Sequence, residues 1–401
     1  MEIKQNENQI GTLEIIAAFC ITGMIYMGSF AGPVAAQIME AFKFEASDYK
    51  TINTIPSLMM VVLSLVSGGL TAKYPIKKIV SFAAIFLAIG SLIPVFTTSK
   101  TMYIVSKVIF GVGHGLTFPM ASAIINALFT GEQKDKLMGI RAGVGALMGA
   151  GYTTIAGFVG KAGGYRAALS CSVIVIPLAL FILWKCPSNE LVVKTKKAEG
   201  GANEKKLTGR SYLLFFFMFI YNMMSMALMA NLSLYISAEK LADTGVIGTI
   251  TSMNTYLAFV AGLIFARVKK VLGRYTTSLS FICVSISFLI LMNNTSIPMF
   301  YLAVAINGLG FGLYNPSITL AVAQSAANPK YGALAISGYT SAIGIGQFLS
   351  AKVLKFLNDS FFHFESRPDW KIAFWPVAAI AVGSIVFIAI TGGKDGKKKE
   401  A

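Results

Sequence analysis

Charge is scarce in this 401-residue chain, and acidic residues are missing from most of its length. Charged residues make up 13% of the sequence and hydrophobic residues 55%, so the charged fraction is about half that of an ordinary soluble protein. No Asp or Glu occurs from Tyr49 to Gly131, from Lys136 to Asn189, or from Thr244 to Asn358. A soluble fold cannot hide so much apolar surface, so the composition excludes a set of soluble domains and indicates a membrane protein.

Sequence patterns that support catalysis or metal binding are missing too. The four cysteines show no CxxC spacing, and they fall within or at the end of apolar stretches: Cys20, Cys171, Cys186 and Cys283. That placement is typical of free thiols. The chain has two histidines and no HExxH motif, plausible GxSxG motif or pair of aspartates inside an apolar run. We therefore expect no enzyme activity, no metal and no cofactor.

The basic surplus is spread over short clusters between apolar segments. Lys and Arg total 34 against 18 Asp and Glu, which gives a formal net charge of +16. No long basic tract carries interleaved aromatic residues, so we expect the lipid bilayer and not nucleic acid as the partner of these charges. The N-terminus is polar and lacks a cleavable signal pattern, so we expect the first apolar segment to be retained.

Twelve apolar runs approach or exceed the roughly 20 residues of helix that cross a bilayer. The first six lie near 12–38, 47–72, 77–97, 102–129, 136–160 and 165–186. The other six lie near 210–237, 245–267, 275–293, 297–324, 331–357 and 370–391. Backbone N–H and C=O groups in lipid must form hydrogen bonds within their own segment, as an α-helix allows. The alternation of polar and apolar residues that marks the strands of a β-barrel is absent, so the runs predict an all-α membrane protein.

The distribution of Lys and Arg predicts the orientation. With a cytoplasmic N-terminus, the inner side collects the lysines of the central polar stretch, the KKK near the C-terminus and nine loop residues: Lys73, Lys77, Lys78, Lys134, Lys136, Arg267, Lys269, Lys270 and Arg274. The outer loops are poorer in Lys and Arg. We therefore expect a multi-pass protein of the plasma (inner) membrane with both termini cytoplasmic. We also expect a monomer.

An internal repeat relates the two halves of the chain. At one constant offset, the runs 102–129 and 297–324 align three alternate glycines and a proline, Gly111, Gly113, Gly115 and Pro119 with Gly308, Gly310, Gly312 and Pro316. The glycine-rich runs that follow also match: Gly143, Gly149 and Gly151 with Gly338, Gly344 and Gly346. The repeat predicts a six-helix bundle over 1–186, a linker over 187–209 and a second bundle over 210–401. Such pseudo-symmetric halves are typical of transporters with a solute site between them.

At these residues the chain resembles the major facilitator superfamily. The family's loop motif after helix two resembles Gly68-Gly-Leu-Thr-Ala-Lys73 and its continuation to Lys78, with Ala72 where the family has Asp, and a degenerate second copy includes Arg267. The basic residue before the glycines of helix four is Lys107. The resemblance implies twelve transmembrane helices in two six-helix bundles, transport of a small solute by alternating access, and conformational roles for the motif residues Gly68, Lys73 and Arg267.

Three basic side chains are predicted inside the membrane, where an ionisable group costs roughly 2.5–3.5 kcal/mol and is a functional candidate by default. Lys107 and His114 are seven residues apart, so they share one helix face with Gly111. Arg141 follows on the next helix, and its guanidinium suits a carboxylate. Lys107 and Arg141 could instead reach lipid headgroups, and His114 could bond a neighbouring helix.

Polar neutral side chains are further candidates for solute binding. The selected ones are Tyr26, Asn222, Asn254, Tyr314, Asn315 and Gln347. Tyr152, Tyr221 and Tyr256 are similar, because amphipathic rings suit both cavities and ordinary packing. Small residues let helices approach closely, so we expect gating or conformational roles for the glycines Gly111, Gly113, Gly115, Gly149 and Gly346.

The predicted fixed charge inside the membrane is basic, which favours a small organic anion or carboxylate as the solute. Glu14 and Glu40 lie near the ends of the first run, and no acid lies clearly at mid-depth. This favours anion exchange (an antiporter), facilitated flow or coupling through His114. The alternative is an exporter of hydrophobic compounds or drugs, acting as a proton antiporter. It is supported by the Met- and Phe-rich seventh run, FFFMFIYNMMSMALM.

Overall fold

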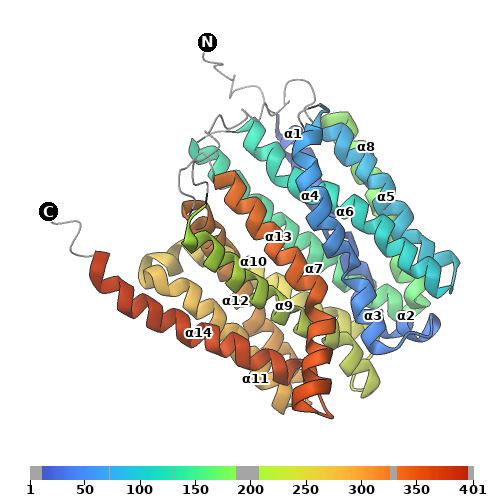
Figure 1. Cartoon of the computed structure of the whole chain (residues 1–401). Helices are drawn as coiled ribbons and strands as arrows, with labels where there is room; N and C mark the ends of the chain where they lie inside the picture. Colours follow the sequence, from blue (N-terminus) through green and yellow to red (C-terminus); the bar gives the residue numbers. More distant parts are fainter. Residues whose placement is uncertain (1–10, 72, 130, 187–206, 326–331, 396–401) are drawn as a thin grey trace. The chain divides into compact units, whose positions relative to one another are not determined.

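The computed structural model describes residues 11–71, 73–129, 131–186, 207–325 and 332–395, and the regular elements in these ranges are helices (Figure 1). Within them, nine helices are long and apolar enough to cross a membrane, and one, Gly143–Lys185, covers two of the predicted spans. The predicted spans without such a helix are 47–72 and 331–357, which carry many small or polar residues. The prediction of an all-α membrane protein is confirmed.

The helices pack as two compact units. The first holds the chain up to Phe44 and from Ile55 to Glu199; the second holds Glu45–Thr54 and the chain from Gly200 onward. The main division lies inside the predicted linker 187–209, most of which falls outside the described residues. The grouping of Glu45–Thr54 with the second unit differs from the predicted bundle of 1–186.

The first unit consists of the helices that cover most of the first half of the chain. These are α1 (Thr12–Ile25), the 3₁₀ helix η1 (Tyr26–Ala31), α2 (Ala35–Ala41), α4 (Ile55–Thr71), α5 (Ile76–Phe96), α6 (Lys100–Leu128), α7 (Gly131–Ser170), η2 (Cys171–Ile174) and α8 (Val175–Lys185). In α7, Gly164 has φ 72°, a left-handed conformation that glycine adopts without strain, so the helix breaks where two spans were predicted to meet.

The second unit consists of α3 and the helices of the second half. These are α3 (Ala46–Asn53), α9 (Gly209–Ala238), α10 (Thr244–Leu272), η3 (Gly273–Tyr275), α11 (Thr276–Asn293), α12 (Ile297–Gln324), α13 (Gly332–Leu357), the short π-helix η5 (Asn358–Phe362) and α14 (Pro368–Asp395). Side chains cap the N-termini of α9 and α10. The hydroxyl of Thr208 accepts a hydrogen bond from the Ser211 N–H, and the carboxylate of Asp243 accepts one from the Val246 N–H.

The first predicted span, 12–38, is not one continuous helix. It consists of α1, the tighter 3₁₀ turns of η1 and part of α2. Gly28 and Gly32 lower the helical propensity of this stretch, and Pro33 cannot donate a backbone hydrogen bond. Because α1 ends at Tyr26, backbone groups at this point lose their regular α-helical hydrogen bonds. The side chains after the break also no longer follow the faces of α1.

The second predicted span, 47–72, is divided at Thr54 into α3 and α4. Pro56 explains the division, because it lacks the N–H that would bond to the Ile52 carbonyl and it disfavours helical geometry at the preceding residue. The Thr54 hydroxyl instead donates to the Thr51 carbonyl at 2.7 Å. The two pieces belong to different compact units.

The alternate glycines of α6 set the close packing of the first unit. A methyl group on Gly111 or Gly115 would lie within about 3 Å of Met59 on α4, at 2.8 Å and 2.9 Å respectively. A methyl group on Gly113 would lie 2.7 Å from the Ala83 carbonyl of α5. Two glycines four residues apart therefore face α4, and the glycine between them faces α5.

The corresponding glycines of α12 repeat this arrangement in the second unit. Cβ atoms on Gly308 and Gly312 would overlap backbone atoms of Asn254 and Ala258 on α10, whereas one on Gly310 would lie 2.9 Å from the Ser280 carbonyl of α11. The repeat found in the sequence is therefore a repeat of helix contacts. In both units these glycines lie at contacts between helices of the same unit.

We expect Gly308→Ala to destabilise the protein, although Gly→Ala inside a helix normally stabilises by about 1 kcal/mol. The new methyl group would overlap the Asn254 backbone, and overpacking of this kind costs roughly 1–3 kcal/mol. Gly262→Ala in α10 is the matched control, because nothing lies within 4 Å of its Cβ position. Thermal unfolding in detergent should show a lower Tm for Gly308→Ala only; equal Tm values would contradict this account.

Candidate functional site

Lys107 lies on α6 with its side chain half-buried. Its ammonium group is 4.9 Å from the centroid of the Tyr103 ring, one turn earlier on the same helix. Tyr103 is fully buried, so this cation–π contact stabilises the charge away from water. The predicted solute contact of Lys107 stays a prediction.

His114 lies on the same helix, between the rings of Phe110 and Phe118, whose centroids are 6.0 Å and 5.9 Å away. Its imidazole hydrogen-bonds the backbone of Ile25, where α1 ends. Within the described part of the chain, the buried Nδ1 atom has no hydrogen-bond partner. With Nε2–H donating to the Ile25 carbonyl, Nδ1 is a free acceptor in neutral histidine.

Arg141 lies on α7 close enough to Tyr26 for the two side chains to interact electrostatically. Among the described residues, nothing accepts a hydrogen bond from its buried Nε–H. A buried donor without a partner costs about 1–3 kcal/mol, and more when the group is charged. The Arg141 guanidinium therefore keeps one hydrogen-bond donor, the Nε–H, unused.

Tyr26 reaches Arg141 because two glycines of α7 leave room for its ring. A Cβ on Gly145 would lie 2.8 Å from Cε2 of Tyr26, and one on Gly149 would lie 2.5 Å from Cδ1. Both glycines are on the helix face that carries Arg141, at intervals of four residues. The structure thus places Gly149 against Tyr26 of η1.

A residue that the sequence analysis missed, Thr22, lies beside this group. Its hydroxyl is buried without a partner in the described ranges, and a Cβ on Gly145 would lie 2.6 Å from its methyl group. We name Thr22, Tyr26, His114 and Arg141 the α1-break cluster. The sequence signal that could have indicated this cluster is the glycine- and proline-rich stretch after Tyr26. This stretch follows the end of α1, beside which the cluster lies.

Another unused hydroxyl lies close to the cluster. The buried Tyr152 hydroxyl has no partner in the described chain and lies 3.3 Å from a Cβ built on Gly23, and its ring stacks on Phe30 with centroids 4.9 Å apart. Most buried polar groups in proteins are hydrogen-bonded. Several free polar atoms around one helix break therefore indicate a place for a polar ligand or water.

Three of the predicted polar residues of the second unit, Asn222, Asn254 and Tyr314, hydrogen-bond other residues of that unit. The Asn222 amide donates to the Tyr314 hydroxyl at 3.3 Å and to the Met218 carbonyl at 2.9 Å. The Asn254 amide donates to Oδ1 of Asn307 at 2.8 Å. These pairs connect helices of the second unit, α9 with α12 and α10 with α12.

The other predicted residues are distributed over several elements. Lys73 and Arg267 are exposed, and Gln347 is half-buried. A Cβ on Gly346 would lie 2.5 Å from the Phe219 carbonyl, so α13 and α9 pack at backbone distance there. The surroundings of Gly68 in α4 and of Asn315 in α12 lie outside the described residues.

Comparisons with known proteins agree with this architecture. The sequence model of the Major Facilitator Superfamily matches residues 16–214 and 214–401. The chain is 22% identical over 182 residues to the putative niacin/nicotinamide transporter NiaP of Bacillus subtilis (strain 168), covering 45% of this chain and 46% of the relative. The matched part is thus less than half of that relative.

Solved structures give the same fold over nearly the whole chain. The nucleoside transporter NupG superposes with a TM-score of 0.75 at 13% identity, covering 94% of this chain and 99% of that one. A peptide transporter of the POT family superposes with a TM-score of 0.73 at 14% identity, covering 94% of each chain. At such identities the likeness shows the fold alone.

Proposed function

The chain belongs to the major facilitator superfamily and carries a small solute across a membrane by facilitated or secondary transport, and on that basis we propose that its solute is a small organic anion. It is a multi-pass membrane transporter and not an enzyme. We further propose that it works by alternating access with both termini in the cytoplasm.

The observation that carries this proposal is the α1-break cluster. It combines a half-buried arginine whose buried Nε–H is unused with a neighbouring phenol and a histidine, and the sequence contains no acid from Tyr49 to Gly131 or from Lys136 to Asn189. A carboxylate would supply the acceptors that Arg141 lacks and would form strong charge-assisted hydrogen bonds. The Tyr26 and Thr22 hydroxyls could bond to its second oxygen or to a polar substituent.

The name of one relative agrees with this solute class. The putative transporter NiaP is named for niacin and nicotinamide, and niacin is an aromatic carboxylic acid that is ionised at neutral pH. This makes nicotinate a suitable first probe, since nicotinamide has nearly the same shape and no charge.

We expect purified protein in liposomes to take up labelled organic anions, tested with nicotinate, benzoate and lactate, and to prefer nicotinate over nicotinamide. The reason is that Arg141 has no acidic partner among the described residues and keeps a buried Nε–H unused, so it should bind an anion better than a neutral analogue of the same shape. Liposomes without protein are the control. Uptake of all anions at background, together with export of cationic dyes, would reject the proposal in favour of a drug exporter.

A further inference from the structure

The α1-break cluster contains two buried polar atoms that can each form a hydrogen bond in one direction only. The Nε–H of Arg141 can only donate, and within the described chain it has no acceptor. The Nδ1 atom of His114 has no partner among the described residues either. Because the Ile25 carbonyl can only accept, the imidazole proton lies on Nε2, and Nδ1 of the neutral ring can only accept. The cluster therefore holds one unused donor and one unused acceptor.

The surroundings of His114 favour the neutral imidazole. Its ring lies between two phenylalanine rings, and burying a charged group against apolar neighbours is costly unless an acid pairs with it. The chain contains no Asp or Glu from Tyr49 to Gly131, a stretch that includes all of α4, α5 and α6. On α1, Glu14 lies eleven residues before Ile25, about 16 Å along the helix. Nδ1 is therefore an acceptor in search of a donor.

The donor and the acceptor are arranged around one point of the chain. His114 is bonded to Ile25, the last residue of α1, and Arg141 interacts with Tyr26, the first residue of η1. The Cα atoms of consecutive residues are about 3.8 Å apart. Since α6 and α7 thus present the two atoms to the same end of α1, a small solute seated there can contact both.

The other unused groups in this region do not distinguish donors from acceptors. The hydroxyls of Thr22 and Tyr152 are buried without a partner in the described ranges. A hydroxyl can rotate to donate or to accept, so it bonds either kind of group. Of these four side chains, Arg141 and His114 alone impose a requirement on the solute, and the two requirements are opposite.

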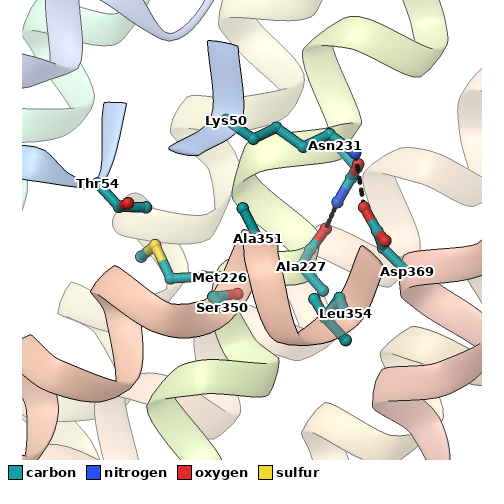
Figure 2. Close-up of a pocket in the computed structure, with 9 residues that line it drawn as sticks. All are labelled: Lys50, Thr54, Met226, Ala227, Asn231, Ser350, Ala351, Leu354 and Asp369. Atoms are coloured by element: carbon teal, nitrogen blue, oxygen red, sulfur yellow. Dashed lines mark hydrogen bonds and ion pairs between the residues drawn. The ribbon is translucent and has the colours of Figure 1, made fainter. Parts of the chain in front are cut away.

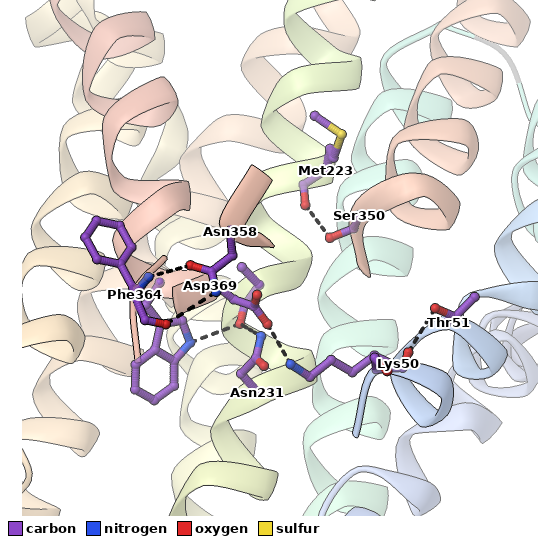
Figure 3. Close-up of polar contacts among 11 residues, drawn as sticks. Lys50, Thr51, Met223, Asn231, Ser350, Asn358, Phe364 and Asp369 are labelled. Carbon is purple, nitrogen blue, oxygen red and sulfur yellow. Dashed lines mark hydrogen bonds and ion pairs between the residues drawn. The ribbon is translucent and has the colours of Figure 1, made fainter. Parts of the chain in front are cut away.

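A polar pocket of the second unit shows the contrasting arrangement. Its polar side chains each have a partner within that unit: Lys50, Thr54, Asn231, Ser350 and Asp369. The ammonium nitrogen of Lys50 lies 2.6 Å from Oδ2 of Asp369 (Figure 2). The Ser350 hydroxyl donates to the Met223 carbonyl at 2.6 Å (Figure 3). The pocket is thus satisfied by its own residues, whereas the α1-break cluster is not.

We propose that the solute carries a hydrogen-bond donor besides its anionic group, and that Nδ1 of His114 accepts this hydrogen bond and selects for it. The inference rests on the anion proposal above and narrows the solute to a hydroxylated or N–H-bearing organic anion. In the bound state the anionic group accepts from the Arg141 guanidinium, and the hydroxyl or N–H of the solute donates to Nδ1. An anion without such a donor leaves a buried acceptor unbonded, which weakens its binding.

Matched pairs of anions test this requirement on the purified protein in detergent, with isothermal titration calorimetry as the measurement. The pairs are benzoate with its 2-, 3- and 4-hydroxy derivatives, and propionate with lactate. Within a pair the carboxylate is kept and one hydroxyl is added, and the three benzoate isomers place that hydroxyl at different distances from the carboxylate. We expect the best hydroxylated anion to bind about tenfold tighter than its parent, the effect of one additional hydrogen bond.

His114→Gln shows whether Nδ1 is the atom that selects. The glutamine amide nitrogen can take the place of Nε2 and donate to the Ile25 carbonyl, while no acceptor replaces Nδ1. We expect the tenfold preference to fall to about one, with the affinity for the parent anion unchanged. A purely structural role would instead lower both affinities together. Arg141→Gln should weaken both members of a pair and leave their ratio as in the wild type.

His363→Gln is the matched control, because this second histidine is exposed and follows η5. It should leave every affinity at the wild-type value. Equal affinities within all pairs, or a preference that persists in His114→Gln, would overturn the role of His114 and leave the anion proposal in place. If no anion of either kind binds the wild-type protein, the anion proposal is rejected and this inference is rejected with it.

Discussion

Arg141→Gln is expected to raise the KM for nicotinate roughly 10- to 150-fold, the equivalent of about 1.5–3 kcal/mol for hydrogen bonds to a charged group. The buried Nε–H has no partner in the described structure, so its main favourable interaction comes from the bound anion. Initial rates of uptake into proteoliposomes over a range of nicotinate concentrations measure the effect. Arg141→Lys should be intermediate, because a lysine keeps the charge and loses the bidentate geometry.

Arg166→Gln is the control for this experiment, since Arg166 is an exposed arginine on the same helix, α7. It should leave KM unchanged. The Tm of Arg141→Gln shows whether Arg141 serves solute binding or the stability of the protein. Removing a charge whose hydrogen bonds are incomplete should leave the Tm equal to or higher than that of the wild type, whereas loss of a structural contact would lower it. A wild-type KM for nicotinate in Arg141→Gln would contradict the assignment of Arg141 to the solute site.

Most of the fold was predictable, because helices that cross lipid must satisfy their own backbone and leave long apolar runs in the sequence. The repeated glycines of α6 and α12 were recognised as a duplication, and the structure adds the physical reason: each set contacts two neighbouring helices at close range. The breaks at Tyr26 and Thr54 were missed. Gly28, Gly32 and Pro33 follow the first break and Pro56 follows the second, but the length expected of a membrane span led us to treat each run as one helix.

The candidate site was predictable only in part. Lys107, His114 and Arg141 were selected because charge inside a membrane is costly, and two of them, His114 and Arg141, contact the region where α1 ends. The role of Thr22 could not be predicted, since it depends on how a glycine of α7 faces α1. The Lys50–Asp369 pair spans 319 positions of the sequence, and no local pattern indicates such a contact.

Gly149→Leu is expected to reduce transport below about a tenth of the wild-type rate while the protein still inserts. A Cβ at this position already lies 2.5 Å from the Tyr26 ring, so a larger side chain must displace Tyr26 from Arg141. Gly151→Ala is the control on the same helix, because nothing lies within 4 Å of its Cβ position. Uptake and the amount of protein in the membrane are measured together. Wild-type uptake by Gly149→Leu would contradict the role of this glycine.

Comparison with Gly346→Leu distinguishes a clash with a side chain from a clash with the backbone of a neighbouring helix. The obstacle at Gly149 is a ring, which Tyr26→Ala removes, so the double variant should regain the Tm of the single Tyr26→Ala variant without regaining transport. The obstacle at Gly346 is the Phe219 carbonyl, 2.5 Å from the Cβ position, and no second side-chain substitution can relieve it. Recovery of transport in the Tyr26→Ala, Gly149→Leu double variant would show that Tyr26 only fills space, since a ring needed for solute binding cannot be replaced by a methyl group.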